Sequence, residues 1–121
     1  MVVWVMLAGA AGAIGRYAVH RAMESHVASA LPWGTIAVNV AGSLALGVVV
    51  GLVLAQGVDP DVQVIVGTGF LGAFTTFSAF SYETFALLED GAPRAALLNG
   101  LGSVVAGLLA ATVGLAVVGA L

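Results

Sequence analysis

The sequence predicts an all-α integral membrane protein with four transmembrane helices. Of its 121 residues, 61% are hydrophobic, only 7% are charged, and none is lysine. Soluble domains carry about 25% charged residues, because a small domain exposes much of its surface to water. The mean hydropathy is +1.15. This composition argues against a water-soluble globule, a disordered protein and a nucleic-acid binder.

Charged residues divide the chain into long apolar segments. The uncharged stretches are residues 25–58, 62–82 and 95–121, with a shorter one at 1–15. A helix that crosses a bilayer needs about 20 predominantly apolar residues. The expected helices are approximately Val2–Ala22, Trp33–Ala55, Val62–Leu88 and Ala95–Gly119.

Short breaks separate these helices. Each break contains a proline, and the breaks fall at Ser25–Pro32, Gln56–Pro60 and Glu89–Pro93. Such short loops join antiparallel neighbours, and we expect residues 1–121 to form a single transmembrane domain. The segment Met1–Ala13 resembles a signal peptide, but it lacks a positively charged start, so we interpret it as part of the first helix.

The charges specify the orientation of the chain only weakly. Arg21 and Arg94, with Arg16 nearby, lie on one side of the expected bundle, together with several acids. The charged residues of the other side are Asp59 and Asp61. Arginine and lysine favour the cytoplasmic side. Because the bias is shallow, the chain is free to insert both ways or to pair with an oppositely oriented partner.

Small residues recur at every fourth position of the second and fourth expected helices. The two stripes are Ser43, Gly47, Gly51 and Ser103, Gly107, Ala111. Such stripes let membrane helices approach closely, and packing within one bundle explains most of them. Four closely packed helices leave no room for a conduit within one chain, so any pore would lie between subunits.

Polar residues inside the expected second helix share one face. Thr35, Asn39 and Ser43 are spaced at i, i+4 and i+8. Polar groups in hydrocarbon are costly, so they are hydrogen-bonded or functional. The Asn39 amide either makes an interhelical hydrogen bond or lines a water or anion path with its N–H donors.

The expected third helix contains three glycines, followed by threonines and serines, within residues 67–85. Glycine and threonine are poor helix formers, and we expect an interruption near Gly72–Thr76. Backbone groups freed inside a membrane are tolerated where they are buried or line a cavity, and such breaks often hold ions. Carbonyls without a nearby acid suit Na⁺ better than a divalent ion. The alternative is a straight helix whose hydroxyls bond to their own carbonyls.

Phe74, Phe77 and Phe80 recur at every third residue of this segment. Such a stripe faces lipid, packs in the protein core, or presents the positive edges of its rings to an anion. Ring edges beside Asn, Ser and Thr donors suit a conduit, because a fixed cation would bind the anion too tightly for conduction.

The remaining charged residues leave several roles open. Three roles are open for Glu83: its side chain snorkels to the membrane interface, pairs with an arginine, or lies at the mouth of a pathway. Two roles are open for Arg16: it snorkels, or it gives a vestibule positive charge. No catalytic constellation is visible, and zero cysteines exclude thiolate chemistry. We therefore expect that the protein is not an enzyme.

Three strings resemble the Fluc (CrcB) family of fluoride channels over essentially the whole chain. They are Gly-Ala-Ile-Gly-Arg-Tyr at 12–17, Pro-Trp-Gly-Thr-Ile-Ala-Val-Asn at 32–39 with Gly-Ser at 42–43, and Gly-Phe-Leu-Gly-Ala-Phe-Thr-Thr-Phe-Ser-Ala-Phe-Ser-Tyr-Glu at 69–83. The resemblance is weaker in the fourth helix, where Asn99 replaces a tyrosine and Gly107 replaces a second serine.

The resemblance implies an antiparallel dual-topology dimer with a broken third helix and fluoride pores along the subunit interface. The partner would be a second copy or a sister chain of opposite orientation. Fluoride would leave the cell passively, down its electrochemical gradient, through a multi-pass protein of the plasma or inner membrane, and the cell would become fluoride-resistant.

The resemblance also assigns residues. Phe77 and Phe80 would turn their ring edges to fluoride, and a structural Na⁺ would bind the backbone carbonyls of Gly72 and Thr75. Arg16 is assigned to the vestibule. The full set implied for the fluoride pore is Asn39, Thr76, Phe77, Ser78, Phe80, Ser81, Glu83, Thr84 and Ser103.

Two other functions remain open from the sequence. A proton-coupled efflux transporter of the small multidrug-resistance type has a similar size, but it depends on an acid deep in a helix, and Glu83 is the only candidate. A non-conducting assembly subunit is the other alternative, in which the glycines and phenylalanines only pack.

Overall fold

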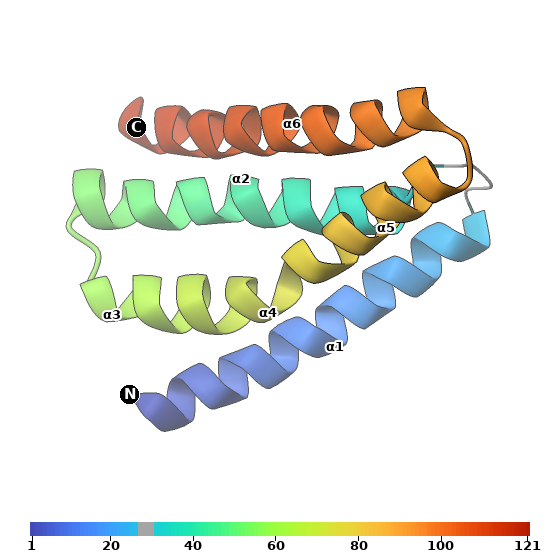
Figure 1. Cartoon of the computed structure of the whole chain (residues 1–121). Helices are drawn as coiled ribbons and strands as arrows, with labels where there is room; N and C mark the ends of the chain where they lie inside the picture. Colours follow the sequence, from blue (N-terminus) through green and yellow to red (C-terminus); the bar gives the residue numbers. More distant parts are fainter. Residues whose placement is uncertain (27–30) are drawn as a thin grey trace.

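The computed structural model describes residues 1–26 and 31–121, and within these ranges it is helical and contains no strand (Figure 1). Four of its helical segments are long and apolar enough to cross a membrane, which confirms the expected fold class. The elements are α1 (Val2–His26), α2 (Trp33–Gln56), α3 (Pro60–Val62), η1 (Gln63–Leu71), α4 (Gly72–Phe74), α5 (Phe77–Glu89) and α6 (Pro93–Gly119).

The helix ends lie close to the predicted ones for chemical reasons that the sequence carries. Helix α2 ends at Gln56 and is capped by Gly57, whose φ of 69° is a left-handed conformation that favours glycine. The Asp59 side chain then caps α3 by accepting a hydrogen bond from the Asp61 N–H at 2.9 Å. Pro93 opens α6. The first predicted break, Ser25–Pro32, lies partly outside the described residues.

Helices α2 and α6 lie side by side along most of their length (Figure 1). Their small residues allow this approach, since a Cβ on Gly47 would collide with the Ala111 carbonyl. A Cβ on Gly114 would lie 2.8 Å from the Val48 nitrogen. The small-residue stripes therefore act in packing within the chain, as the sequence predicted for most of them.

The first half of the third span packs against α1. It contains a π-helix, η1, in which the Gly72 N–H donates to the Gly67 carbonyl five residues earlier. A Cβ on Gly12 would collide with the Phe70 carbonyl, and a Cβ on Gly69 would lie 3.0 Å from the Val5 carbonyl oxygen. Backbone-to-backbone approach of this kind is possible only with glycine at both positions.

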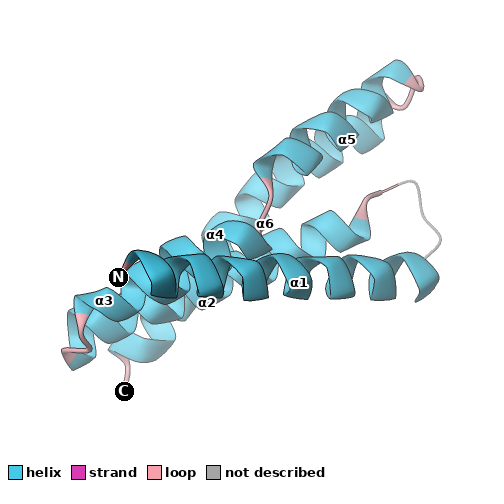
Figure 2. Cartoon of the chain, turned by 90° about the horizontal axis from the view of Figure 1, so that it is seen from below, coloured by secondary structure: helices cyan, strands magenta, loops and turns pink. Residues whose placement is uncertain are grey.

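The third span is broken, as the sequence predicted. Helix α4 ends at Phe74, and the next two residues are extended, with φ/ψ of −86°/162° at Thr75 and −146°/124° at Thr76. Helix α5 then leaves in a different direction (Figure 2). The Thr76 hydroxyl caps the new helix by accepting from the Ala79 N–H at 3.2 Å. The straight-helix alternative is therefore wrong.

Very few side chains are fully buried in the single chain. The largest of them are Val38, Asn99 and Thr35, and two of these three are polar. Large apolar side chains along α1 and α6 are exposed instead, as expected for surfaces that face lipid or another subunit. Specific hydrogen bonds at the polar positions therefore position the helices around the break.

Candidate functional site

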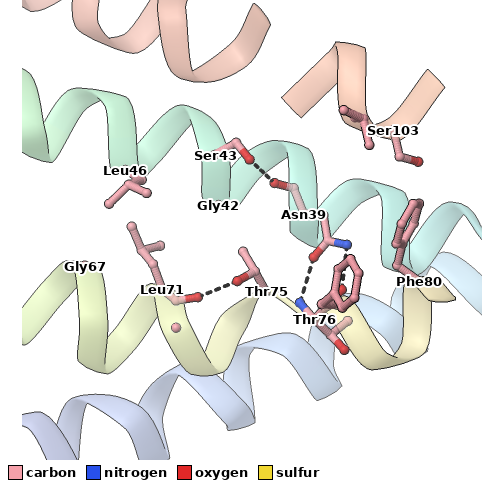
Figure 3. Close-up of a pocket in the computed structure, with 13 residues that line it drawn as sticks. Asn39, Gly42, Ser43, Leu46, Gly67, Leu71, Thr75, Thr76, Phe80 and Ser103 are labelled. Atoms are coloured by element: carbon pink, nitrogen blue, oxygen red, sulfur yellow. Dashed lines mark hydrogen bonds between the residues drawn. The ribbon is translucent and has the colours of Figure 1, made fainter. Parts of the chain in front are cut away.

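An open pocket of about 350 Å³ lies beside the break, between α2, the third span and α6 (Figure 3). It combines amide and hydroxyl groups with aromatic and small residues. Its lining residues are Asn39, Gly42, Ser43, Leu46, Gly67, Leu71, Gly72, Thr75, Thr76, Phe77, Phe80, Ser103 and Val104.

Asn39 holds the extended segment with a reciprocal pair of hydrogen bonds. Its Nδ2 donates to the Thr76 carbonyl at 2.8 Å, and the Thr76 N–H donates to Asn39 Oδ1 at 2.7 Å (Figure 3). In an unbroken helix this N–H would donate to the Gly72 carbonyl. Asn39 therefore makes the interhelical bond considered from the sequence, and at the same time it lines the pocket. One of its two N–H bonds is not used in any contact among the described residues.

Gly42 provides the space for the break. A Cβ at this position would collide with Thr75 Cγ2. The Thr75 hydroxyl donates back to the Leu71 carbonyl at 2.9 Å, which satisfies the last turn before the extended segment. On the same face of α2, the Ser43 hydroxyl donates to the Asn39 carbonyl at 2.8 Å.

The break frees backbone carbonyls at the two positions assigned to Na⁺. The Gly72 carbonyl has lost its helical donor to Asn39, and Gly72 itself is exposed. The Thr75 carbonyl accepts a hydrogen bond from Arg16 at 3.3 Å, and its second lone pair remains available. The described residues hold no group of three His, Cys, Asp or Glu side chains that could bind a metal. The assignment of Na⁺ to the Gly72 and Thr75 carbonyls stays a prediction.

Arg16 is half-buried beside the break rather than extended into solvent. Its guanidinium places a positive charge next to the extended segment, through the bond to the Thr75 carbonyl. The vestibule role assigned to it stays a prediction.

The phenylalanines divide into two groups. Phe70 and Phe74 stack on each other with ring centroids 5.8 Å apart, and Phe74 lies against Gly15 of α1. Phe77 and Phe80 line the pocket, with centroids 5.9 Å apart and ring planes tilted by 44°. The side chain of Phe77 is 79% exposed. The break separates Phe74 from Phe77 and Phe80. The three rings therefore do not form the single stripe that a continuous helix would present.

Several assigned residues lie outside the pocket lining. Ser78 and Ser81 are exposed, and the Ser78 hydroxyl lies 3.4 Å from that of Thr76. The Thr84 hydroxyl donates to the Phe80 carbonyl at 2.8 Å. Asn39, Thr76, Phe77, Phe80 and Ser103 do meet at the pocket, together with the Gly72 and Thr75 positions.

Glu83 pairs with a hydroxyl. Thr35, only 1% exposed, donates to Glu83 Oε1 at 2.9 Å. The other oxygen, Oε2, is buried and has no hydrogen-bond partner among the described residues. One oxygen of Glu83 is therefore held away from the surface, and Glu83 does not pair with an arginine among the described residues. The sequence placed Thr35 on the polar face of its helix but gave it no role at the site.

Sequence reasoning did not assign Asn99 to the site. This residue is 1% exposed, and its Nδ2 donates to the Thr84 hydroxyl at 2.8 Å. The Ser103 hydroxyl donates to its Oδ1 at 3.5 Å. The available signal was a buried amide in an otherwise apolar helix, one turn before Ser103.

Comparison with known proteins places the chain in a family. The family described as "CrcB-like protein, Camphor Resistance (CrcB)" matches residues 3–115. The chain belongs to the CrcB family. This confirms the resemblance read from the sequence strings.

Three curated CrcB relatives are similar over nearly their whole length. "Fluoride-specific ion channel FluC 1" of Symbiobacterium thermophilum is 49% identical, covering 93% of this chain and 94% of the relative. The Leifsonia xyli protein of the same name is 43% identical over 95% and 84% of the two chains. "Fluoride-specific ion channel FluC" of Magnetococcus marinus is 45% identical over 96% and 95%. CrcB membership confirms that the chain is a multi-pass membrane protein of ion transport and not an enzyme.

Proposed function

We propose that this CrcB chain is a subunit of a fluoride-selective channel through which fluoride passes down its electrochemical gradient. The pocket beside the break is the observation that carries this proposal. Its lining combines the Asn39 amide with the rings of Phe77 and Phe80 and the Ser103 hydroxyl. The amide N–H is the positive end of a dipole, the ring edge is the positive rim of a quadrupole, and neither is a fixed charge. The names of the curated relatives support the same ion.

Uncharged donors suit the permeation of a strongly hydrated anion. Each water molecule that fluoride loses must be replaced by a protein group that offers the ion a partial positive charge, because otherwise fluoride stays hydrated in solution. Sites that are too strong would trap the ion, because conduction requires several weak sites in sequence. The spare N–H of Asn39 and the neighbouring ring edges provide such weak sites.

The pore in this proposal lies between two subunits of opposite orientation. The pocket is open on one side, and Phe77 is 79% exposed there in the single chain. A second chain would close the pocket and cover this ring. The weak arginine bias is compatible with a dual-topology homodimer or with a sister chain of fixed, opposite orientation. The two-fold arrangement would create two pores.

A structural Na⁺ belongs to the same proposal. The carbonyls of Gly72 and Thr75 from each of two subunits would surround one cation. Bound Na⁺ supplies positive charge that offsets the mutual repulsion of opposed carbonyl dipoles. The protein's part is to keep these carbonyls free of helical donors: Asn39 takes the Thr76 N–H that would bond to the Gly72 carbonyl, and the Thr76 hydroxyl takes the Ala79 N–H that would bond to the Thr75 carbonyl.

The physiological role in this proposal is fluoride export across the cell's plasma or inner membrane, which would make the cell fluoride-resistant. Fluoride accumulates in a cell that HF enters, because HF dissociates at the higher internal pH. A passive pore then suffices for export, since the membrane potential drives the anion outward.

Fluoride efflux from liposomes tests the proposal. Purified protein in vesicles loaded with potassium fluoride should release fluoride rapidly once valinomycin removes the charge imbalance, and vesicles loaded with chloride should release little. Efflux that requires an imposed proton gradient would favour the proton-coupled transporter. No fluoride release from vesicles that contain the folded protein would favour a non-conducting assembly subunit.

A further inference from the structure

Asn99 occupies an unusual position for an amide. It lies on α6 and is 1% exposed, so the surrounding side chains exclude it from the surface. A polar group buried in this way is costly unless its donors and acceptor are used. Simple helix adhesion would explain one hydrogen bond. Asn99 uses both ends of its amide, and both bonds lead toward residues of the pocket wall.

The first bond reaches the helix that carries the phenylalanines. Asn99 Nδ2 donates to the Thr84 hydroxyl at 2.8 Å, and this hydroxyl donates to the Phe80 carbonyl at 2.8 Å. A hydroxyl has one proton, so with that proton on the Phe80 carbonyl it must accept from Asn99. This fixes the amide orientation, with nitrogen toward Thr84 and oxygen toward Ser103. The same bond connects α5, just after the break, to α6.

The second bond controls a hydroxyl that lines the pocket. Ser103 lies on the pocket wall near Phe80 (Figure 3). Its hydroxyl donates to Asn99 Oδ1 at 3.5 Å, which is a long and therefore weak hydrogen bond. While this bond is made, Ser103 presents lone pairs to the pocket, and these repel an anion. Rotation of the hydroxyl would turn its proton toward the pocket and break only this weak bond.

We propose that Asn99 is a positioning residue for the pathway, which keeps α5 docked on α6 through Thr84 and holds the Ser103 hydroxyl proton until an anion reaches the pocket. The proposal rests on the proposed channel function. Asn99 itself does not contact the anion. It acts by giving the Ser103 proton a second, weaker acceptor, so that Ser103 alternates between Asn99 and the ion.

A double-mutant cycle in the fluoride efflux assay tests this proposal. Its members are the wild type, Asn99→Leu, Ser103→Ala and the double variant. Leucine keeps the volume of Asn99 and removes its polar atoms. Each single variant should reduce the efflux rate three- to tenfold. Without the Asn99 amide the Ser103 hydroxyl would bond more strongly to a carbonyl of its own helix, and without Ser103 the hydroxyl donor is lost. The double variant should lose less than the product of the two single losses, because the bond of Asn99 to Thr84 contributes separately while its bond to Ser103 no longer exists.

A matched control comes from the same helix. Thr112 is exposed on α6 and donates only to the Leu108 carbonyl at 2.8 Å, so Thr112→Val removes a hydroxyl from α6 without touching the pocket. Its efflux rate should equal that of the wild type. Asn99→Thr keeps a group that donates to Thr84 and accepts from Ser103, and it should recover most of the rate lost in Asn99→Leu. If Asn99→Leu does not fold, the cycle is run with Asn99→Ala and Ser103→Ala, since alanine also removes both polar ends of the amide.

The outcomes separate this proposal from the proposed function. Wild-type vesicles that release no fluoride would overturn the channel function itself. Fast wild-type efflux with rate losses that multiply in the double variant would overturn the role of Asn99, since the two side chains would then act independently. Fast wild-type efflux that is unchanged in Asn99→Leu would overturn it as well.

Discussion

Asn39 and Thr76 exchange two hydrogen bonds across the break, at 2.8 Å and 2.7 Å, and so replace the helical bond that Thr76 has lost. A side-chain amide has one donor side and one acceptor side, as a peptide group does, and therefore it pairs with extended backbone. This single residue satisfies both backbone groups of Thr76 in hydrocarbon and also lines the pocket beside them.

Replacing Asn39 by aspartate tests this double role. A carboxylate still accepts from the Thr76 N–H, but it cannot donate to the Thr76 carbonyl, and it brings negative charge to the pocket. We expect Asn39→Asp to reduce fluoride efflux by about tenfold or more, which corresponds to about 1.4 kcal/mol or more in the barrier. Thr112→Val is the control, since Thr112 is exposed on α6 and does not line the pocket. Equal efflux from Asn39→Asp and wild type would remove Asn39 from the pathway.

The two pocket phenylalanines are tested by isoleucine, which keeps an apolar side chain but has no ring edge. We expect Phe77→Ile and Phe80→Ile each to reduce fluoride efflux about tenfold, while the melting temperature in detergent changes little. Phe85→Ile is the matched control, because Phe85 lies on the same helix, is exposed, and does not line the pocket. Similar losses in all three variants would show that the rings act only through packing.

The contact between Gly42 and Thr75 predicts a rescue. A methyl group at position 42 would collide with Thr75 Cγ2, so Gly42→Ala should destabilise the protein by about 1–3 kcal/mol, as overpacking does. Serine at position 75 lacks that methyl group but keeps the hydroxyl that bonds to Leu71. The double variant Gly42→Ala with Thr75→Ser should therefore recover stability in thermal or denaturant unfolding.

Gly102→Ala serves as the control for this pair, since a Cβ at Gly102 would meet only Leu98 of the same helix, at 3.7 Å. This variant should unfold like the wild type. A Gly42→Ala protein that is as stable as the wild type, or one that Thr75→Ser fails to improve, would contradict the close approach at the break.

Removal of Na⁺ should lower stability if the carbonyls of Gly72 and Thr75 hold the cation. A ligand that binds only the folded state stabilises it by about 2.7 kcal/mol at 100 times its dissociation constant. The melting temperature should therefore rise with Na⁺ concentration and reach a plateau, while choline at equal ionic strength leaves it unchanged. Identical melting in Na⁺ and choline would refute the structural cation.

Much of the local structure was readable from the sequence. The uncharged stretches 25–58, 62–82 and 95–121, with the shorter one at 1–15, predicted the four spans, because a helix of about 20 apolar residues satisfies its backbone inside a bilayer. The break near Gly72–Thr76 followed from residues that form helices poorly. The pairing of Asn39 with Thr76 did not follow, since it depends on how two distant segments meet.

The sequence by itself determined the number of spans, the interruption in the third one and the chemistry of the polar groups, because helix length, propensity and hydrogen-bonding capacity are local properties. Only the tertiary structure decided which partners those groups found. It separated Phe74 from Phe77 and Phe80, joined Thr35 to Glu83, and connected Asn99 to the pocket wall. Partner choice depends on the close approach of helices far apart in sequence, which glycine contacts such as Gly47 with Ala111 make possible.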